Sequence, residues 1–590
     1  MTSSTARLAT GCALMLSLPW LAACTEPSET ARQGTPEITT VVPTQVDTPP
    51  PSAPATTEAP EETDPHPSDA DVTTAPGQPV QDNQLGAYGV SAGHPRAAEA
   101  GTLMLEQGGN AVDAAIAAAF ADSVLHPATS GIGGGGAAIV LTDGAADSYD
   151  YREVVGVDGT IPADHVGAPG FVAGMARLHE DHGSLPWADL LQPALIAAQD
   201  GVPVSGFLAM TLALPDGQSA TTGLDHFRGA DGSPLLEDDL LVQQDLANTL
   251  AALAQEGPQA LYTGSLAQQL LRVPGLDAAT VAGYDVQVLP APSGEIGNYT
   301  LLSAAPALPG AALIQLVQIA ESGGIADVEP YSREFVDLTS QAWGVAEESV
   351  QTVLGDPAFV DVPVDRLIDP VVNAALADQV LALGPEDDGH VPAMAAGTSY
   401  QGSGNTTHIS VVDADGGAVS MTNTITYFWG SGRYVDGYFL NNHLERFEAI
   451  GTTDANNPSP GRRSVSWSAP SMVLDDAGRP VLVLGTPGGQ QIPNTIASAV
   501  LRWTLHGEEL EDLVAAPRFL HVGGELLLEN SDLAEEMREL GYVVRVLDPS
   551  RRSEFGSLQA LEVDWDQGSV TSVADDRRSG GFSLGTLGRK

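Results

Sequence analysis

Residues 406–424 alternate between apolar and polar positions in the pattern of two β-strands. The first strand starts at Thr406, and the chain turns at Asp415-Gly416-Gly417 before it returns to Thr424. Side chains in a strand point alternately to opposite faces, and a turn rich in Asp and Gly joins antiparallel strands. The pattern therefore predicts a hairpin with a threonine at its open end.

Helical periodicity and strand-like alternation are interspersed along the rest of the chain. Because the two patterns do not alternate as regular βαβ units, they favour a layered α+β body over a doubly wound sheet. We expect helices at 99–106, 111–125, 170–178, 185–200, 244–256, 264–271, 312–321, 496–505 and 533–540. We expect strands at 137–142, 286–302, 471–474, 481–484, 526–529 and 543–547.

A glycine-rich run, Ser130-Gly-Ile-Gly-Gly-Gly-Gly136, precedes the expected strand at 137–142. A phosphate-binding loop of this kind precedes a helix and ends in Lys followed by Ser or Thr, and neither feature is present here. The run instead indicates close packing of backbone around a site.

The first 23 residues are typical of an export signal. They carry one charge, Arg7, then an apolar run, and end in Leu-Ala-Ala before Cys24. The pattern resembles a bacterial lipoprotein signal, in which Cys24 is lipidated and becomes the mature N-terminus. The alternative is an ordinary secretory signal with an incidental cysteine. We expect an exported protein held by its lipid on the outer face of the cytoplasmic membrane.

Residues 24–84 are rich in Pro, Thr, Glu and Ser and nearly lack large apolar side chains. Such a segment cannot bury enough surface to offset its conformational entropy, so it is expected to be a disordered tether. From residue 85 onward, Gly, Ala, Val and Leu recur, and the length is ample for a large core.

The chain is strongly acidic, with 24 Lys plus Arg against 76 Asp plus Glu and a formal net charge of -52. Phosphates would be repelled, so nucleic acid is excluded as a partner, and membrane contact is expected through the lipid anchor only. Lys590 is the sole lysine, which excludes Schiff-base chemistry from the core. The histidines show no metal-ligand spacing, so neither a metal nor a cofactor is expected.

Thr406 has the properties of a nucleophile if the chain is cut before it. Its hydroxyl would attack, and its new α-amine, with an ordinary pKa of about 8, would accept the proton near neutral pH. The β-branch restricts χ1 and keeps the oxygen aimed. By itself the pattern is equally that of an ordinary half-buried strand.

Many short motifs in order along the body resemble those of the γ-glutamyltransferases, also called γ-glutamyltranspeptidases, among the N-terminal nucleophile hydrolases. No single motif is decisive, but their number and order are specific. They are Gly93-His-Pro95, Gln107-Gly-Gly-Asn-Ala-Val-Asp113, the run at 130–136, Ala168-Pro-Gly170, Gly183-Ser-Leu-Pro-Trp187, Gly355-Asp-Pro-Ala-Phe-Val-Asp361, Thr406-Thr-His408, Gly430-Ser-Gly432, Leu440-Asn-Asn442, Thr486-Pro-Gly-Gly489 and Ala516-Pro-Arg518.

The resemblance implies a four-layer αββα sandwich made as one precursor. The chain would cut itself between Asn405 and Thr406, and a large subunit, 85–405, would stay associated with a small subunit, 406–590. The mature enzyme would move an acyl group from a small amide or peptide to water or an amine through an acyl-Thr406 intermediate.

The resemblance also implies roles for other residues. Thr424 matches a threonine that hydrogen-bonds the nucleophile, and Gly488-Gly489 match the pair whose backbone NH groups form the oxyanion hole. Arg152 matches the arginine that grips the substrate's α-carboxylate. Ser466 matches the first of two assisting serines.

The sequence departs from the family where the α-ammonium of a glutamyl group is held. An asparagine, a glutamine and an aspartate of the family are replaced by Thr426, His443 and Arg446, and the second serine is Trp467. Losing the aspartate alone should cost about ten- to a hundredfold in affinity, since a charge-assisted hydrogen bond contributes about 1.5 to 3 kcal/mol. Efficient γ-glutamyl transfer would need Glu445, beside Arg446, to supply the replacement carboxylate.

Three interpretations are compatible with these departures. In the first, the enzyme transfers γ-glutamyl or related carboxylate-bearing acyl groups. In the second, it is a glutaryl-type acylase or a poly-γ-glutamate depolymerase, with Arg152 and Arg446 pairing with anions. In the third, it is a surface-tethered binding protein that kept the fold and lost substrate capture.

Overall fold

The structure is a computed structural model that describes residues 72–75, 84–381, 404–450 and 453–587. The predicted export signal, Cys24 and most of the predicted tether lie outside the described residues. Every described residue belongs to a single unit of the chain, 67–590.

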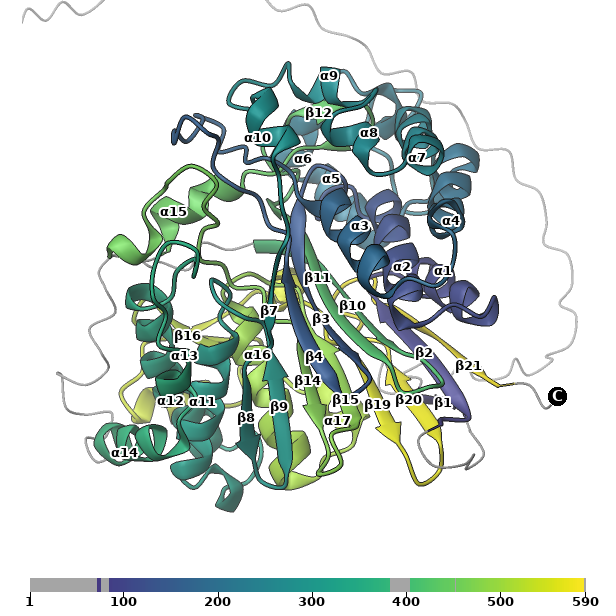
Figure 1. Cartoon of the computed structure of the whole chain (residues 1–590). Helices are drawn as coiled ribbons and strands as arrows, with labels where there is room; N and C mark the ends of the chain where they lie inside the picture. The colour runs from purple at the N-terminus through teal and green to yellow at the C-terminus, as the bar shows by residue number, and fades with distance from the viewer. Residues whose placement is uncertain (1–71, 76–83, 382–403, 451–452, 588–590) are drawn as a thin grey trace, which may run out of the picture. The chain divides into compact units, whose positions relative to one another are not determined.

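Two seven-stranded antiparallel sheets form the centre of the molecule (Figure 1). The first has the order β21 (Gly581–Thr586), β2 (Ala87–Ala92), β10 (Gly404–Val412), β11 (Ala418–Tyr427), β3 (Gly135–Thr142), β4 (Ala145–Asp150) and β7 (Gln287–Pro290). The second has the order β1 (Val72–Ala75), β20 (Ser569–Val573), β19 (Gln559–Asp564), β15 (Pro480–Gly485), β14 (Ser471–Leu474), β9 (Tyr299–Ser303) and β8 (Ser293–Ile296).

Helices cover the outer face of each sheet, so the molecule has four layers (Figure 1). The first sheet is covered mainly by α1 (Pro95–Glu106), α2 (Ala111–Leu125), α3 (Phe171–His182), α4 (Trp187–Asp200) and α7 (Gln244–Glu256). The second is covered by α11 (Gly310–Ser322), α12 (Arg333–Thr352), α14 (Pro370–Leu381) and α16 (Gln491–Leu501). This arrangement confirms the predicted αββα sandwich.

Each interface between layers has its own apolar core. Between the sheets, buried residues such as Ile139, Val412, Met472, Val483 and Leu561 interdigitate. One larger cluster joins the first sheet to its helices, and another joins the second sheet to its helices. Because the hairpin β10–β11 lies near the centre of the first sheet, its residues belong to the core between the sheets and to the core under the first layer of helices, and it offers a rigid platform for a site.

The helix α2 shows how local sequence sets an element. Asn110 accepts hydrogen bonds from the backbone of Val112 and Asp113, while Asp113 accepts one from the backbone of Asn110. This capping box fixes the N-terminus. All fifteen residues of α2 are buried, as an apolar, alanine-rich helix packed on every side must be.

The remaining elements are short or peripheral. They are α5 (Gly206–Ala213), α6 (Pro215–Ala220), α8 (Gln259–Tyr262), α9 (Ala267–Leu270), α10 (Ala278–Ala282), α13 (Val364–Leu367), α15 (Arg446–Ala449), α17 (Leu510–Ala515), α18 (Ala534–Glu539), the pairs β5 (Val202–Pro203) with β6 (Leu240–Leu241) and β12 (Tyr434–Val435) with β13 (Tyr438–Phe439), and the small sheet β16 (Phe519–Val522), β17 (Glu525–Leu528) and β18 (Val544–Val546).

Several elements differ from the sequence prediction, among them β1 and α12. Val72–Ala75, expected inside the tether, forms the edge strand β1 on β20, so the tether prediction is wrong over these residues. The backbone of β20 supplies the hydrogen-bonding partners of this strand. The helix α12, Arg333–Thr352, was not predicted.

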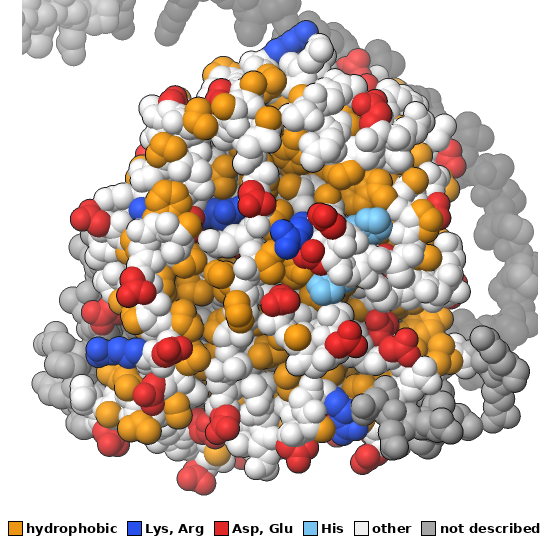
Figure 2. Space-filling model, in the orientation of Figure 1, with side chains coloured by type: hydrophobic (Ala, Val, Ile, Leu, Met, Phe, Trp, Pro, Cys, Tyr) orange, Lys and Arg blue, Asp and Glu red, His pale blue; other side chains and the backbone are white. Residues whose placement is uncertain are grey.

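Acidic side chains are spread over the face seen in Figure 2, with fewer basic ones among them. This distribution matches a solvated acidic surface better than a single acidic recognition face. Within the described ranges, no helix combines the length and apolar character needed to span a bilayer.

Candidate active site

The cleavage site predicted between Asn405 and Thr406 lies at the open end of the hairpin β10–β11. Thr406 pairs with Thr424, but Asn405 pairs with Thr426, so the register shifts at the bond between Asn405 and Thr406. This bulge leaves one residue of β11 unpaired and locally bends the ladder. The ladder is therefore irregular at the bond that the sequence predicts to be cut.

Thr424 contacts that bond directly. Its Oγ1 donates a hydrogen bond of 2.6 Å to the carbonyl oxygen of Asn405 and accepts one of 2.8 Å from the backbone N–H of Thr426. Thr426 has a φ of +86°, an uncommon conformation for a β-branched residue that costs of order 1–3 kcal/mol. The strained backbone at Thr426 thus orients the hydroxyl that polarises the Asn405 carbonyl.

A small cavity of about 10 Å³ opens beside these residues. This volume holds about one water molecule, and Gly404 and Asn405 of the uncut chain form part of its wall. The lining residues are Gly404, Asn405, Thr406, Thr424, Thr426, His443, Arg446, Ser466, Trp467, Ser468, Gly489 and Ile492. Most of the residues that the sequence assigned to the site therefore meet in one place.

Gly488 and Gly489 form the turn that leads from β15 into α16. Their φ angles are +134° and +66°, which favour glycine. A Cβ on Gly404 would lie 2.5 Å from the Gly489 Cα and 3.0 Å from its nitrogen, so this turn packs directly against the chain that precedes Thr406. The buried N-terminal end of α16 follows at once.

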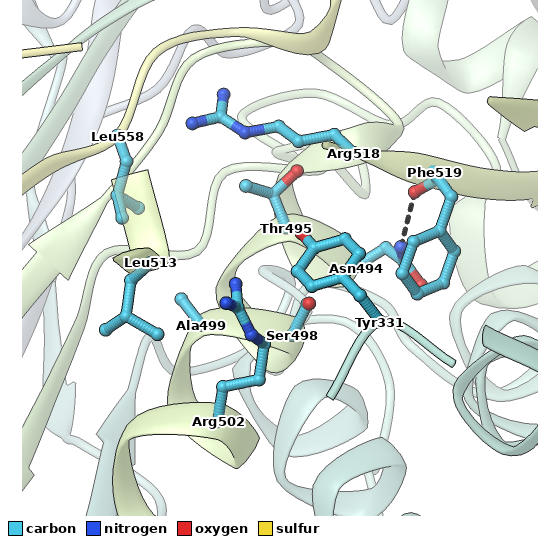
Figure 3. A pocket seen from close by; sticks show the side chains of 10 residues that line it. All are labelled: Tyr331, Asn494, Thr495, Ser498, Ala499, Arg502, Leu513, Arg518, Phe519 and Leu558. Atoms are coloured by element: carbon cyan, nitrogen blue, oxygen red, sulfur yellow. Dashed lines mark hydrogen bonds between the residues drawn. The ribbon is translucent and has the colours of Figure 1, made fainter. Parts of the chain in front are cut away.

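A second cavity, shown in Figure 3, lies on another part of α16 and contains none of the predicted catalytic residues. Arg518 of the Ala-Pro-Arg motif lines it and donates a hydrogen bond of 2.8 Å to the Phe555 carbonyl. The backbone at Gly556 approaches the Cβ position of Gly488 to 3.5 Å. Arg518 therefore supports the backbone against which the Gly488 turn rests.

Arg446 gives the cavity beside Thr406 its positive charge. The side chain is buried and its Cζ lies 5.4 Å from the centre of the Tyr427 ring. Burial lowers its pKa below the ordinary arginine value, and Tyr427 and Glu445 act in the opposite direction, yet arginine stays charged at neutral pH. Within the described part of the chain, no carboxylate forms an ion pair with Arg446.

His443 occupies the wall beside Arg446. Its Nδ1 lies 2.8 Å from Thr426 Oγ1, and its Nε2 has no hydrogen-bond partner among the described residues. Burial, with the positive charges of Arg152 and Arg446, holds the pKa of His443 well below its usual range. The imidazole is therefore neutral at neutral pH.

Arg152 and Glu445 do not line the cavity. Arg152 is fully buried: Nε and Nη2 bond to Asp150 at 2.9 and 2.5 Å, and Nη1 bonds to the Ser464 carbonyl at 2.6 Å. Its guanidinium is therefore paired with the carboxylate two residues earlier. Glu445 accepts a hydrogen bond from Tyr427 instead and also lies outside the lining.

Ser466 and Trp467 both line the cavity. The Trp467 ring also packs 6.1 Å from that of Trp343 on α12, so it belongs to the apolar core and to the wall at once. Its bulk replaces the hydrogen-bonding group that a serine would offer.

The glycine-rich run confirms the predicted close packing. A Cβ on Gly134 would lie 2.2 Å from the carbonyl oxygen of Thr424, and one on Gly136 would lie 2.4 Å from that of Thr422. His408 bonds to Thr422 at 2.9 Å, in keeping with a satisfied structural histidine. The run lets β3 lie directly beside the strand that carries Thr424.

Two buried residues near the site were not found from the sequence. Arg578 bonds through Nη1 to the Thr406 carbonyl at 3.4 Å. Glu153 lies 3.6 Å from His443 Nδ1, through its Oε2. Glu153 follows the singled-out Arg152, but only the fold shows that it faces His443.

Comparisons with known proteins agree with this geometry. A family model described as gamma-glutamyltranspeptidase matches residues 97–585. The capsule biosynthesis protein CapD proenzyme of Bacillus anthracis is 32% identical over 500 residues, covering 84% of this chain and 90% of that protein. A glutathione hydrolase proenzyme of Pseudomonas aeruginosa is 31% identical, covering 82% and 92%. The acylase ACY 1 proenzyme of Pseudomonas sp. strain SE83 is 32% identical, covering 74% and 83%.

Among solved structures, the cephalosporin acylase from Bacillus halodurans superposes with a TM-score of 0.76 at 23% identity, covering 88% of this chain and 98% of that one. The layers and the hairpin thus define an α+β fold of the N-terminal nucleophile hydrolase type.

The chain belongs to the gamma-glutamyltranspeptidase family. It is an acyl-transferring hydrolase, and several of its relatives are named as proenzymes. The reading as a binding protein without activity is not favoured.

Proposed function

We propose that Thr406 is the nucleophile of both self-cleavage and substrate turnover. In self-cleavage, the Thr406 hydroxyl attacks the Asn405 carbonyl carbon, the C–N bond breaks, and an ester and a free Thr406 amine form. Water then hydrolyses the ester, leaving the Asn405 carboxylate. The hydrogen bond from Thr424 to the Asn405 oxygen supports this step, because it strengthens as negative charge develops there.

After cleavage, residues 404–405 no longer need to fill the site, and an acyl group takes their place. The Thr406 amine accepts the hydroxyl proton while the oxygen attacks the substrate amide. The oxyanion lies against the Gly488-Gly489 turn, and the leaving amine departs with a proton. Water or an amine then takes the acyl group from Thr406.

We further propose that the preferred acyl donor carries an anionic group and lacks the α-ammonium of a glutamyl donor. The observation that carries this proposal is the position of Arg446 in the same cavity as Thr406. An ammonium group there would meet a buried positive charge with no carboxylate partner, whereas a carboxylate would form a charge-assisted pair. Glutaryl groups and polymers with extra carboxylates have this chemistry.

The relatives support this direction without fixing a substrate. Capsule biosynthesis and acylase proenzymes are among them, beside glutathione hydrolases. A depolymerase of poly-γ-glutamate is the second candidate, because its substrate places free carboxylates along the chain. Efficient transfer from an ordinary γ-glutamyl donor is the activity that Arg446 disfavours.

Turnover of glutaryl and γ-glutamyl anilides tests the proposal. We expect kcat/KM for the glutaryl compound to exceed that for the γ-glutamyl compound by tenfold or more. Arg446→Gln should remove most of this preference while self-cleavage continues. A wild-type preference for the γ-glutamyl compound would overturn the proposed donor class, and turnover by Thr406→Ala would overturn the nucleophile.

We also propose that the enzyme is exported and anchored by lipid at Cys24. The support is the short apolar run after Arg7 and the Leu-Ala-Ala-Cys pattern that follows it. Cys24→Ser should move the protein from the membrane fraction to the soluble fraction of the producing cells. An unchanged distribution would contradict lipidation.

A further inference from the structure

Glu153 and His443 form a buried acid–imidazole pair beneath the cavity that contains Thr406. Neither residue is more than 1% exposed, and Glu153 Oε2 lies 3.6 Å from His443 Nδ1. Glycines make room for the carboxyl group: a Cβ on Gly135 would lie 3.0 Å from Glu153 Oε2, and one on Gly167 would lie 2.7 Å from Glu153 Cβ. The pair is therefore built into the packing of the site.

Both members have unused hydrogen-bonding capacity. Neither carboxyl oxygen of Glu153 has a hydrogen-bond partner among the described residues, and the same holds for His443 Nε2. His443 lines the cavity beside Arg446, whereas Glu153 does not. A ligand in the cavity therefore meets the imidazole, and the carboxyl group lies behind it.

The surrounding charges set the state of the empty pair. Burial raises the pKa of Glu153 to about 8, and burial with Arg152 and Arg446 lowers that of His443. At neutral pH both are uncharged, with the proton on the carboxyl group. The titratable and charged groups around the pair are Arg152, Asp150, Arg463 and Tyr284 near Glu153, and Arg446, Tyr427 and Glu445 near His443.

We propose that the pair relocates its proton when an anion binds. In the uncharged pair, His443 carries its proton on Nε2, and Nδ1 accepts a hydrogen bond from the Thr426 hydroxyl. On anion binding the Glu153 O–H bond breaks, an N–H bond forms at His443 Nδ1, the Thr426 hydroxyl turns to accept from it, and the resulting imidazolium joins Arg446 in holding the anion. No proton enters from or leaves to solvent. The new Glu153 carboxylate is stabilised by Arg152, and the imidazolium by the bound anion and by Thr426.

This inference rests on the proposed anionic donor and adds a specificity-determining residue to it. A glutamine, which the family resemblance places at position 443, cannot take up a proton. The exchange to histidine therefore gives this cavity a second positive group only while an anion is present. In the empty precursor the pair stays neutral, which avoids two uncompensated positive charges next to each other.

Infrared difference spectroscopy of the mature enzyme with ¹³C-labelled glutarate tests the proposal. At pH 7, glutarate should abolish one carboxylic-acid C=O band in the wild type, and Glu153→Gln should show no such loss. His443→Gln, the matched control, should bind glutarate more weakly and keep its acid band. A band that persists in the glutarate-bound wild type, or that is lost equally in Glu153→Gln, would overturn the inference.

Kinetics give a second readout that a purely structural role would not move. KM for a glutaryl anilide should stay nearly constant from pH 6 to pH 7.5 in the wild type. In Glu153→Gln the proton must come from solvent, so KM should rise about tenfold per pH unit. If glutarate binds and the acid band persists, the proton transfer is refuted and the proposed donor class stands. If glutarate does not bind and the enzyme prefers the γ-glutamyl compound, the proposed donor class is refuted, and this inference with it.

Discussion

Removal of the Thr424 hydroxyl should slow self-cleavage strongly. The hydroxyl lies in a buried setting and donates a 2.6 Å hydrogen bond to the carbonyl oxygen of Asn405. Thr424→Val keeps the shape of the side chain and removes the donor, whereas Thr424→Ser keeps the donor and removes the methyl group. The two variants therefore separate hydrogen bonding from packing.

The expected size of the effect follows from the hydrogen bond. A donor to a developing oxyanion contributes about 2.7–4 kcal/mol in comparable sites, so Thr424→Val should slow cleavage by about 10²–10³-fold. A serine has three staggered χ1 wells where threonine is restricted, which costs at most about 0.7 kcal/mol. Thr424→Ser should therefore cleave within about threefold of the wild type.

Cell-free synthesis followed by a time course on denaturing gels measures these rates, since the precursor and its two products differ in size. A melting curve for each purified precursor shows whether the variant has folded. Cleavage of a folded Thr424→Val precursor at the wild-type rate would refute the reasoning, because the Asn405 carbonyl would then need no donor from Thr424.

Three further changes test other parts of the site. Gly489→Ala places a Cβ 2.9 Å from the Gly404 Cα of the precursor at a φ of +66° and should slow self-cleavage at least a hundredfold. The control Gly478→Ala, at a φ of +77° with open space around it, should only lower stability by about 1–2 kcal/mol; equal cleavage rates would contradict the role of the turn. Arg446→Asp should raise the ratio of kcat/KM for the γ-glutamyl anilide to that for the glutaryl anilide by about ten- to a hundredfold. An unchanged ratio would contradict the role of Arg446 in donor choice. Burial raises the pKa of Glu347 on α12 to about 8, so folding takes up a proton between about pH 4.5 and pH 8, and the free energy of unfolding falls as pH rises through this window. In urea unfolding, the stability of Glu347→Gln relative to the wild type should therefore increase by about 1.4 kcal/mol per pH unit. Parallel pH profiles for the two proteins would contradict the shift.

The parts of the fold that depend on local sequence could be predicted. The helix α2 has the predicted bounds, Ala111–Leu125, because its cap and its apolar residues are all local. The hairpin was predicted for the same reason: alternation and a glycine-rich turn specify it without help from other elements. The 20-residue helix α12 was not predicted, since its apolar positions are interrupted by many polar side chains and tertiary packing completes it.

The membership of the site was predicted better than its interactions. The family resemblance assigned Thr406, Thr424 and Arg446 to one site, and in the structure all three line one cavity. The resemblance did not show that the Asp150 carboxylate is hydrogen-bonded to the Arg152 guanidinium, because this contact depends on the local path of the chain after β4. The contact between Glu153 and His443 joins segments far apart in the sequence, so no local pattern reveals it.

Intact-mass measurement of the purified, active protein tests the central claim most directly. The account predicts two polypeptides divided between Asn405 and Thr406, with the smaller one beginning at Thr406. A single unbroken chain in fully active material would contradict it.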